Sequence, residues 1–207
     1  MPDGERHSRP PLLLVGGFAL FLFIIAYLVV SSVTRRSVPT FDPSPHTTAS
    51  LRSGPRHDDT ITVDARDSKL WRYVDFDRGV AVAPPDTAGW DLAIRRYRVI
   101  ASDAIADLGP RRFEDVREAP DRGFVANAVG GDTVNAAIRR WYHYSMMTHL
   151  LEPAGHAYVV RTRDAHYASV QVLGYYCTGL QPGCLTLRYT YPLAAHGSES
   201  RAAMTEQ

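Results

Sequence analysis

The sequence predicts a mainly β protein: an antiparallel β-sandwich or half-barrel domain preceded by one transmembrane helix and a Pro/Ser-rich linker. Two observations lead to this fold class. Residues 157–192 contain three stretches in which apolar and polar side chains alternate, and a cysteine stands on either side of the last turn. Such alternation is typical of half-buried antiparallel strands. Near the N-terminus, residues 12–30 form a run of nineteen residues without a charge.

These patterns divide the chain into five segments. We expect a short cytoplasmic tail over residues 1–10, a transmembrane signal anchor over 11–34, an extended linker over 35–59, an exported β domain over 60–196 and a tail over 197–207. A domain of this size can bury a core of its own. The chain has 23 Lys and Arg against 22 Asp and Glu, for a net charge of +1 at pH 7. Because neither sign predominates, we expect no nucleic-acid partner.

The uncharged run is long enough to cross a membrane. At about 1.5 Å per residue it spans about 28 Å, close to the ~30 Å hydrocarbon core of a bilayer. The apolar part of a cleaved signal peptide is usually shorter, about 7–15 residues, so we expect a retained anchor. No cysteine directly follows the run, which excludes a bacterial lipoprotein anchor. The side chains expected to face lipid or another helix include Leu12, Phe18, Phe21, Phe23 and Tyr27.

The charges beside the anchor do not fix its orientation, because Arg6 and Arg9 precede it while Arg35 and Arg36 follow it. An exported cysteine pair favours a domain outside the cytoplasm. We therefore expect a single-pass protein of a bacterial inner membrane, with its C-terminal domain in the periplasm.

The linker is predicted from composition. Residues 37–59 contain four prolines and no apolar period, which favours a semi-extended segment. It would hold the domain away from the membrane or bind along a partner as an extended strip. Phe41 is the side chain in it that we expect at a partner interface.

Alternation predicts strands over residues 60–65, 70–76, 80–83 and 90–100. Residues 101–132 are rich in Gly, Pro and charge, so we expect long loops with at most one short strand there. A helix is expected over residues 133–141. Its apolar residues follow helical spacing and an N-cap is available, as shown by Val134, Ala137, Ile138 and Trp141, with Asp132 or Thr133 as the cap.

The two cysteines, Cys177 and Cys184, flank a turn between strands. In an oxidising compartment we expect them to form a disulfide worth about 2–3 kcal/mol; otherwise they are free thiols. Two thiols are too few for a structural zinc site, and the histidine spacings fit no compact metal motif. No metal site and no catalytic residue are predicted, because nucleophile and phosphate-binding motifs are absent.

Several motifs together resemble the HmuY-like domains. The matching residues are Trp71 and Tyr73, the run Trp90-Asp91-Leu92-Ala93, and the terminal YTYP at 189–192. The resemblance covers about residues 60–100 and 141–192, and it implies the fold of bacterial haem-scavenging hemophores. It also implies haem held between two axial His or Met side chains on hairpins. Residues 101–140 contain no His or Met, so the first ligand has no counterpart, whereas Met146, Met147 and His149 lie near the second position.

Three functions remain open. The first is a non-enzymatic accessory subunit that docks on a larger membrane complex, such as a photosynthetic or respiratory one, without a cofactor. The second is a membrane-tethered haem or tetrapyrrole binder with Met146 and His149 as candidate ligands. An enzyme is the third, and no motif supports it. The interface candidates in the domain are Tyr142 and Tyr176; because Tyr175 and Tyr176 are consecutive in a strand, we expect one of them to face outward.

Overall fold

The computed structural model describes residues 12–33, 38–45, 56–78, 80–82, 89–128, 130 and 133–197. The chain divides into two units, Met1–Ser37 and Val38–Gln207. The expected tail over 1–10, residues 198–207 of the expected tail over 197–207, the N-cap Asp132, and Arg6, Arg9, Arg35 and Arg36 lie outside the described residues.

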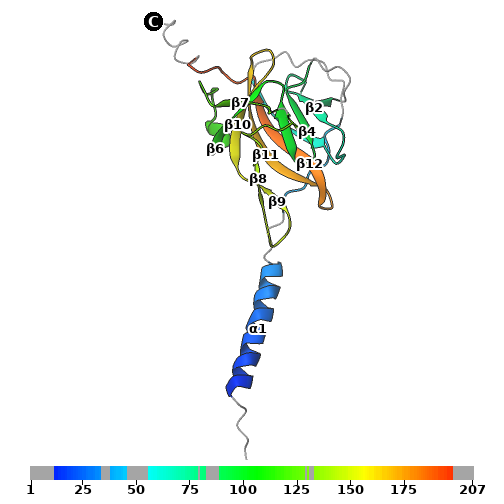
Figure 1. Cartoon of the computed structure of the whole chain (residues 1–207), viewed down its shortest axis with the longest axis vertical. Helices are drawn as coiled ribbons and strands as arrows, with labels where there is room; N and C mark the ends of the chain where they lie inside the picture. Colours follow the sequence, from blue (N-terminus) through cyan, green and yellow to red (C-terminus); the bar gives the residue numbers. More distant parts are fainter. Residues whose placement is uncertain are drawn as a thin grey trace, which may run out of the picture. The chain divides into compact units, whose positions relative to one another are not determined.

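The first unit contains one helix, α1 (Leu12–Val33) (Figure 1). Its residues Leu12–Ser31 are long and apolar enough to cross a membrane. The five side chains expected at its surface are each more than half exposed. The length and composition of α1 fit a membrane anchor or a signal sequence.

The described residues of the second unit form three antiparallel sheets. The strands are β1 (His57–Asp64), β2 (Arg72–Asp75), β3 (Val80–Val82), β4 (Leu92–Arg95), β5 (Arg98–Ala101), β6 (Ala104–Pro110), β7 (Phe124–Ala126), β8 (Tyr142–Tyr144), β9 (Leu151–Pro153), β10 (His156–Arg161), β11 (Tyr167–Cys177) and β12 (Gln181–Tyr191), with a short 3-10 helix, η1 (Phe113–Asp115). The large sheet has the order β1-β12-β11-β10-β6-β7 and the smaller one β3-β2-β4-β5, while β8 and β9 form a separate hairpin. The three C-terminal strands predicted from alternation correspond to β10, β11 and β12.

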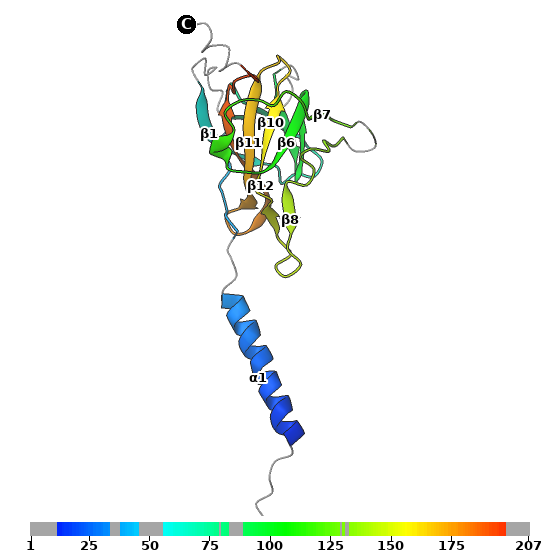
Figure 2. The same ribbon diagram turned by 90° about the vertical axis from the view of Figure 1, so that its left-hand side faces the viewer.

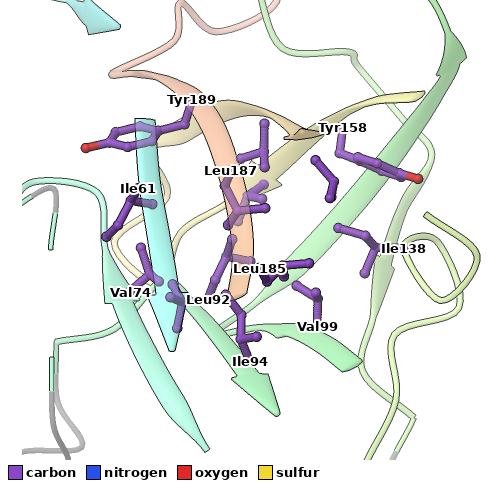
Figure 3. Packing of buried hydrophobic residues seen from close by; sticks show 14 of the residues in the cluster. Ile61, Val74, Leu92, Ile94, Val99, Ile138, Tyr158, Leu185, Leu187 and Tyr189 are labelled. Carbon is purple, nitrogen blue, oxygen red and sulfur yellow. The ribbon is translucent and has the colours of Figure 1, made fainter. Parts of the chain in front are cut away.

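The two larger sheets pack face to face as an open sandwich, as predicted. Along β12, Leu185, Leu187 and Tyr189 are spaced by two residues and so point to the same face, where all three are fully buried. Residues from β1, β2 and β4 meet them in one cluster, which includes Ile61, Val74, Leu92 and Ile94 (Figure 3). Each such aliphatic side chain contributes about 1.5–3 kcal/mol on burial.

A second apolar cluster covers the other face of the large sheet. Along β10, Tyr158 and Val160 join the sandwich core, while Ala157 and Val159 pack with Val116, Ala119 and Leu193. Because β10 is buried on both faces, it forms the middle of the domain.

The strand predicted over residues 90–100 is a hairpin instead. Strands β4 and β5 pair with Ile94 opposite Val99, and the turn between them holds Arg96 at a φ of 56°. The prediction failed here because a non-glycine residue in the left-handed region gives no turn signal in the sequence. The segment expected as long loops also contains β6 and β7, which extend the large sheet.

The helix predicted over residues 133–141 is absent; this segment is a β-bridge followed by turns. Val134 pairs with Ala128, and the Asn135 side chain donates to the Val125 carbonyl oxygen at 2.8 Å. These bonds replace helical ones. The apolar spacing was real, since Ile138 and Trp141 are both buried, but it arises from a turn that packs against the core.

Part of the segment expected as a free linker packs on the domain. The backbone N–H of Phe41 donates to the Tyr176 carbonyl oxygen at 2.9 Å, and Thr40 pairs with Tyr176 in a parallel bridge. Val38 is half-buried against the core. The conformation is extended, as predicted, but residues 38–45 lie along the end of β11 and belong to the domain.

Candidate functional site

The hairpin formed by β8 and β9 carries the candidate ligands predicted from the sequence. Its turn is closed by two backbone bonds, from Ser145 N to Leu150 O at 2.9 Å and from His149 N to Ser145 O at 2.8 Å. Met146 and Met147 lie in this turn and are 75% and 72% exposed. We call residues 145–150 the hairpin tip.

The His149 ring is held by a tyrosine of the same hairpin. Its Nδ1 lies 2.6 Å from the Tyr144 hydroxyl oxygen. When Nδ1 carries the proton and donates it to that oxygen, the lone pair of Nε2 is free. Among the described residues Nε2 makes no hydrogen bond. A histidine oriented through one ring nitrogen in this way is prepared to ligate a metal through the other.

The base of the hairpin is fixed to the core. The Leu151 N–H donates to the Tyr176 hydroxyl at 2.8 Å, and Trp141 Nε1 donates to the Tyr97 carbonyl oxygen at 2.8 Å. Tyr142 packs edge-on against both Tyr97 and Trp141, with ring centroids 5.9 and 5.0 Å apart. The base is therefore rigid, and the tip extends from it.

A cleft of about 430 Å³ lies beside this base, within the size range of small-molecule sites. It is lined by Tyr97, Arg98, Val99, Val134, Asn135, Arg139, Arg140 and Tyr142. Tyrosine faces and three arginines give it an aromatic and positively charged wall. Such a wall suits a flat, conjugated ligand with carboxylates.

The comparisons with known proteins agree with this architecture. A model of the HmuY protein family matches residues 67–189, which is more than half of the chain. The chain belongs to the HmuY family. No curated protein matches it.

Solved structures of the HmuY type share the fold at low sequence identity. One is a HmuY-like heme binding protein from Bacteroides vulgatus, 22% identical, covering 66% of this chain and 93% of that chain with a TM-score of 0.58. Another is a lipoprotein from Bacteroides fragilis, 22% identical, covering 66% and 90% with a TM-score of 0.56. A third is the apo HmuY analog of Tannerella forsythia, 16% identical, covering 66% and 96% with a TM-score of 0.58.

Haem fits some features of this HmuY-family site. The cleft offers ring faces and cations for propionates, but its lining contains no His or Met. The possible iron ligands, Met146 and His149, are on the hairpin tip instead, joined to the cleft through β8. If haem binds here, His149 or Met146 would hold its iron from the tip.

Two interface candidates are packed within the domain. Tyr176 is only 4% exposed, so the expectation that one of the two consecutive tyrosines faces outward is wrong. A register shift between Gly174 and Tyr176 disturbs the alternation, and residues 38–45 cover this end of β11. Phe41 lies on Gly174, where an added Cβ would be 2.7 Å from the ring. The third candidate, Tyr142, is half-buried and lines the cleft.

The remaining histidines of the described chain do not gather into a metal site. Nδ1 of His156 is 2.9 Å from Asp107, and Nδ1 of His166 is 2.9 Å from Asp164. Cys177 and Cys184 form the expected disulfide.

No role was predicted for Asp91, the acidic residue of the Trp90-Asp91-Leu92-Ala93 run. Its carboxylate accepts a hydrogen bond from the Phe76 N–H at 2.8 Å and so holds the turn after β2. Burial raises the pKa of Asp91 to about 7, against the opposing effect of that bond; nearby Asp75, Asp164 and Asp77 raise it further. The residue is structural, although an acidic side chain in a shared motif invites a functional interpretation.

Proposed function

We propose that this HmuY-family chain is a membrane-tethered haem- or tetrapyrrole-binding protein of the hemophore type. The observation that carries the proposal is the β8–β9 hairpin, which presents His149 and Met146 at its exposed tip and has an aromatic, arginine-lined cleft beside its base. Tyr97 and Tyr142 would contact the macrocycle, while Arg139 and Arg140 would pair with its carboxylates. The bound haem would supply an iron centre that takes one ligand from the tip.

Helix α1 and the disulfide support the location that we propose. Helix α1 would retain the chain in a bacterial inner membrane, and a disulfide persists in an oxidising compartment such as the periplasm. A binding role without catalysis also suits this family. Docking on a larger membrane complex stays a prediction. Tyr176 does not support it because this residue is buried, and the half-buried Phe41 packs against Gly174 of its own domain.

Titration of the purified full chain with haemin in detergent, followed at the Soret band, tests the proposal. We expect stoichiometric binding, lost or greatly weakened in His149→Ala if imidazole is the ligand, or in Met146→Ala if the thioether is. Tyr144→Phe removes the partner of Nδ1 and should weaken the imidazole complex roughly 10–100-fold. His143→Ala is the matched control, since it is exposed on the same hairpin. A wild-type chain without a Soret shift would overturn the proposal.

A further inference from the structure

The tip of the β8–β9 hairpin has a surface that is unusual for a loop in water. From Trp141 to Leu151 the chain has no Asp, Glu, Lys or Arg. The neighbouring Met146 and Met147 are the most exposed large apolar side chains of the described domain, and Tyr144 beside them is half exposed. A protruding, uncharged group of this kind is costly in water and marks a contact with another apolar phase.

We infer that this tip is a second membrane contact, in which Met146, Met147 and Tyr144 enter the headgroup region of the bilayer that α1 crosses, beside anionic lipids. The inference rests on the membrane anchoring proposed for α1 and is independent of haem binding. Tyrosine is enriched at the membrane interface, and apolar side chains bury about 5–10 Å into it.

The chain between α1 and the domain is short, and its length limits how far one end of the domain can lie from the bilayer. Helix α1 has 22 residues and is about 33 Å long, so its end at Val33 reaches the boundary of the ~30 Å hydrocarbon core. Only residues 34–37 separate Val33 from Val38, and the five steps between them span at most about 18 Å in any conformation. Val38 already packs on the domain core.

The hairpin leaves the domain at the same end. Residues 38–45 enter along Tyr176, whose backbone accepts from Phe41 N, and the Tyr176 hydroxyl accepts from Leu151 N at the base of the hairpin. Figure 2 shows the β8–β9 hairpin projecting beyond this end of the large sheet. Residues 38–45 and the base of the hairpin therefore both contact Tyr176.

The hairpin is long enough to close the remaining distance. The four residues from Leu151 to Met147 extend about 13 Å at strand spacing. A bilayer is about 40–45 Å thick with headgroups and ~30 Å without them, so each headgroup layer adds about 5–8 Å. An end of the domain held within about 18 Å of the hydrocarbon thus allows the tip to reach the headgroups.

Charge at the base favours anionic lipid. Arg139 and Arg140 are exposed, and with Arg98 they line the cleft beside Tyr142. The sequence between Val33 and Val38 also contains two basic residues, Arg35 and Arg36. Basic residues near an anionic surface are attracted to it and strengthen membrane binding. A lipid surface also fits the small size of the tip better than a protein does, because a stable protein interface needs about 800 Å² per partner.

The test uses the full chain reconstituted in vesicles of phosphatidylethanolamine and phosphatidylglycerol. A spin label is attached at Met147→Cys, while the native cysteines are bonded to each other. We expect the label to be relaxed more by oxygen than by a water-soluble nickel chelate. Access of the chelate to this label should be several-fold lower than its access to a label at the control position. The matched control is Val125→Cys, an exposed apolar position on β7. It lies beside Ile105 and Val160, near the Arg161–Tyr167 end of the large sheet and away from Tyr176.

A label at position 147 as accessible to the nickel chelate as the label at 125 overturns the inference. If the 147 label is protected from the nickel chelate equally well in pure phosphatidylcholine vesicles and in vesicles with phosphatidylglycerol, the assignment to anionic lipid is overturned. In Met146→Asp the protection of the 147 label should be lost while circular dichroism is unchanged; retained protection would contradict insertion of the tip. Haemin titration of the wild-type chain in detergent reports on haem separately, so failure of one proposal is distinguishable from failure of the other.

Discussion

The pH dependence of folding should change when Asp91 is replaced by Asn. Burial raises the pKa of Asp91 to about 7 in the folded domain, whereas an unfolded aspartate titrates near 3.9. The folded state therefore holds this proton over a range in which the unfolded state has released it. The contribution of this Asp91 proton to the free energy of unfolding is fully present below about pH 4 and is lost as the pH rises through about 7. A shift of about 3 units corresponds to about 4 kcal/mol.

In Asp91→Asn the side chain cannot ionise, yet its amide oxygen can still accept the bond from Phe76 N. We therefore expect the stability of the variant, relative to the wild type, to rise by up to about 4 kcal/mol between pH 4 and pH 8. Urea unfolding of the full chain in detergent, followed by circular dichroism at constant ionic strength, measures this difference. Asp121→Asn, at an exposed loop position, is the control for loss of a carboxylate. A difference for Asp91→Asn that stays constant across this range would refute the argument.

Two further predictions concern the end of the domain near the hairpin. Replacing both Cys177 and Cys184 by Ser opens a loop with a sequence separation of 7, which should cost about 2.5 kcal/mol and lower Tm by about 5–10 °C in calorimetry; an unchanged Tm would contradict this loop-entropy estimate. In Gly174→Ala the new Cβ would lie 2.7 Å from the Phe41 ring, so we expect a loss of about 1–3 kcal/mol and faster proteolysis within residues 38–45. The double variant Gly174→Ala with Phe41→Ala should relieve the clash, and a double variant no more stable than Gly174→Ala would argue against it.

The sequence predicted the sandwich well where one face of a strand is apolar and the other polar. Strands β11 and β12 are long and alternate clearly, and helix α1 coincides with a long uncharged run. It failed where structure depends on single contacts. The short strand β7 is defined by its pairing with β6, and the turn at Arg96 depends on a left-handed backbone that tertiary contacts impose.

The candidate site was predicted in part. Met146 and His149 were found because thioether and imidazole are recognisable ligand types, and the structure places both on one hairpin tip. The cleft was not predicted, because β5, a turn and β8 form it from residues distant in sequence. The inward packing of Tyr176 also could not be predicted, since it depends on a register shift and on the covering segment 38–45.

Several residues that carry the family resemblance have structural roles, which explains why they predict the fold better than the function. The Trp90 ring packs edge-on against Tyr73 at 5.5 Å, and Asp91 holds the turn at Phe76. At the other end of the chain Tyr191 stacks on Phe76 at 6.0 Å.

None of these motif residues lies on the β8–β9 hairpin, where the possible iron ligands and the exposed apolar tip occur together. These motifs therefore do not predict the function of this chain, which has to be tested at the hairpin itself. His149 and Met147 are two residues apart, yet the His149 ring is hydrogen-bonded to Tyr144 whereas the Met147 side chain is exposed. Their substitutions separate a ligand that the hairpin binds from a surface that the hairpin touches.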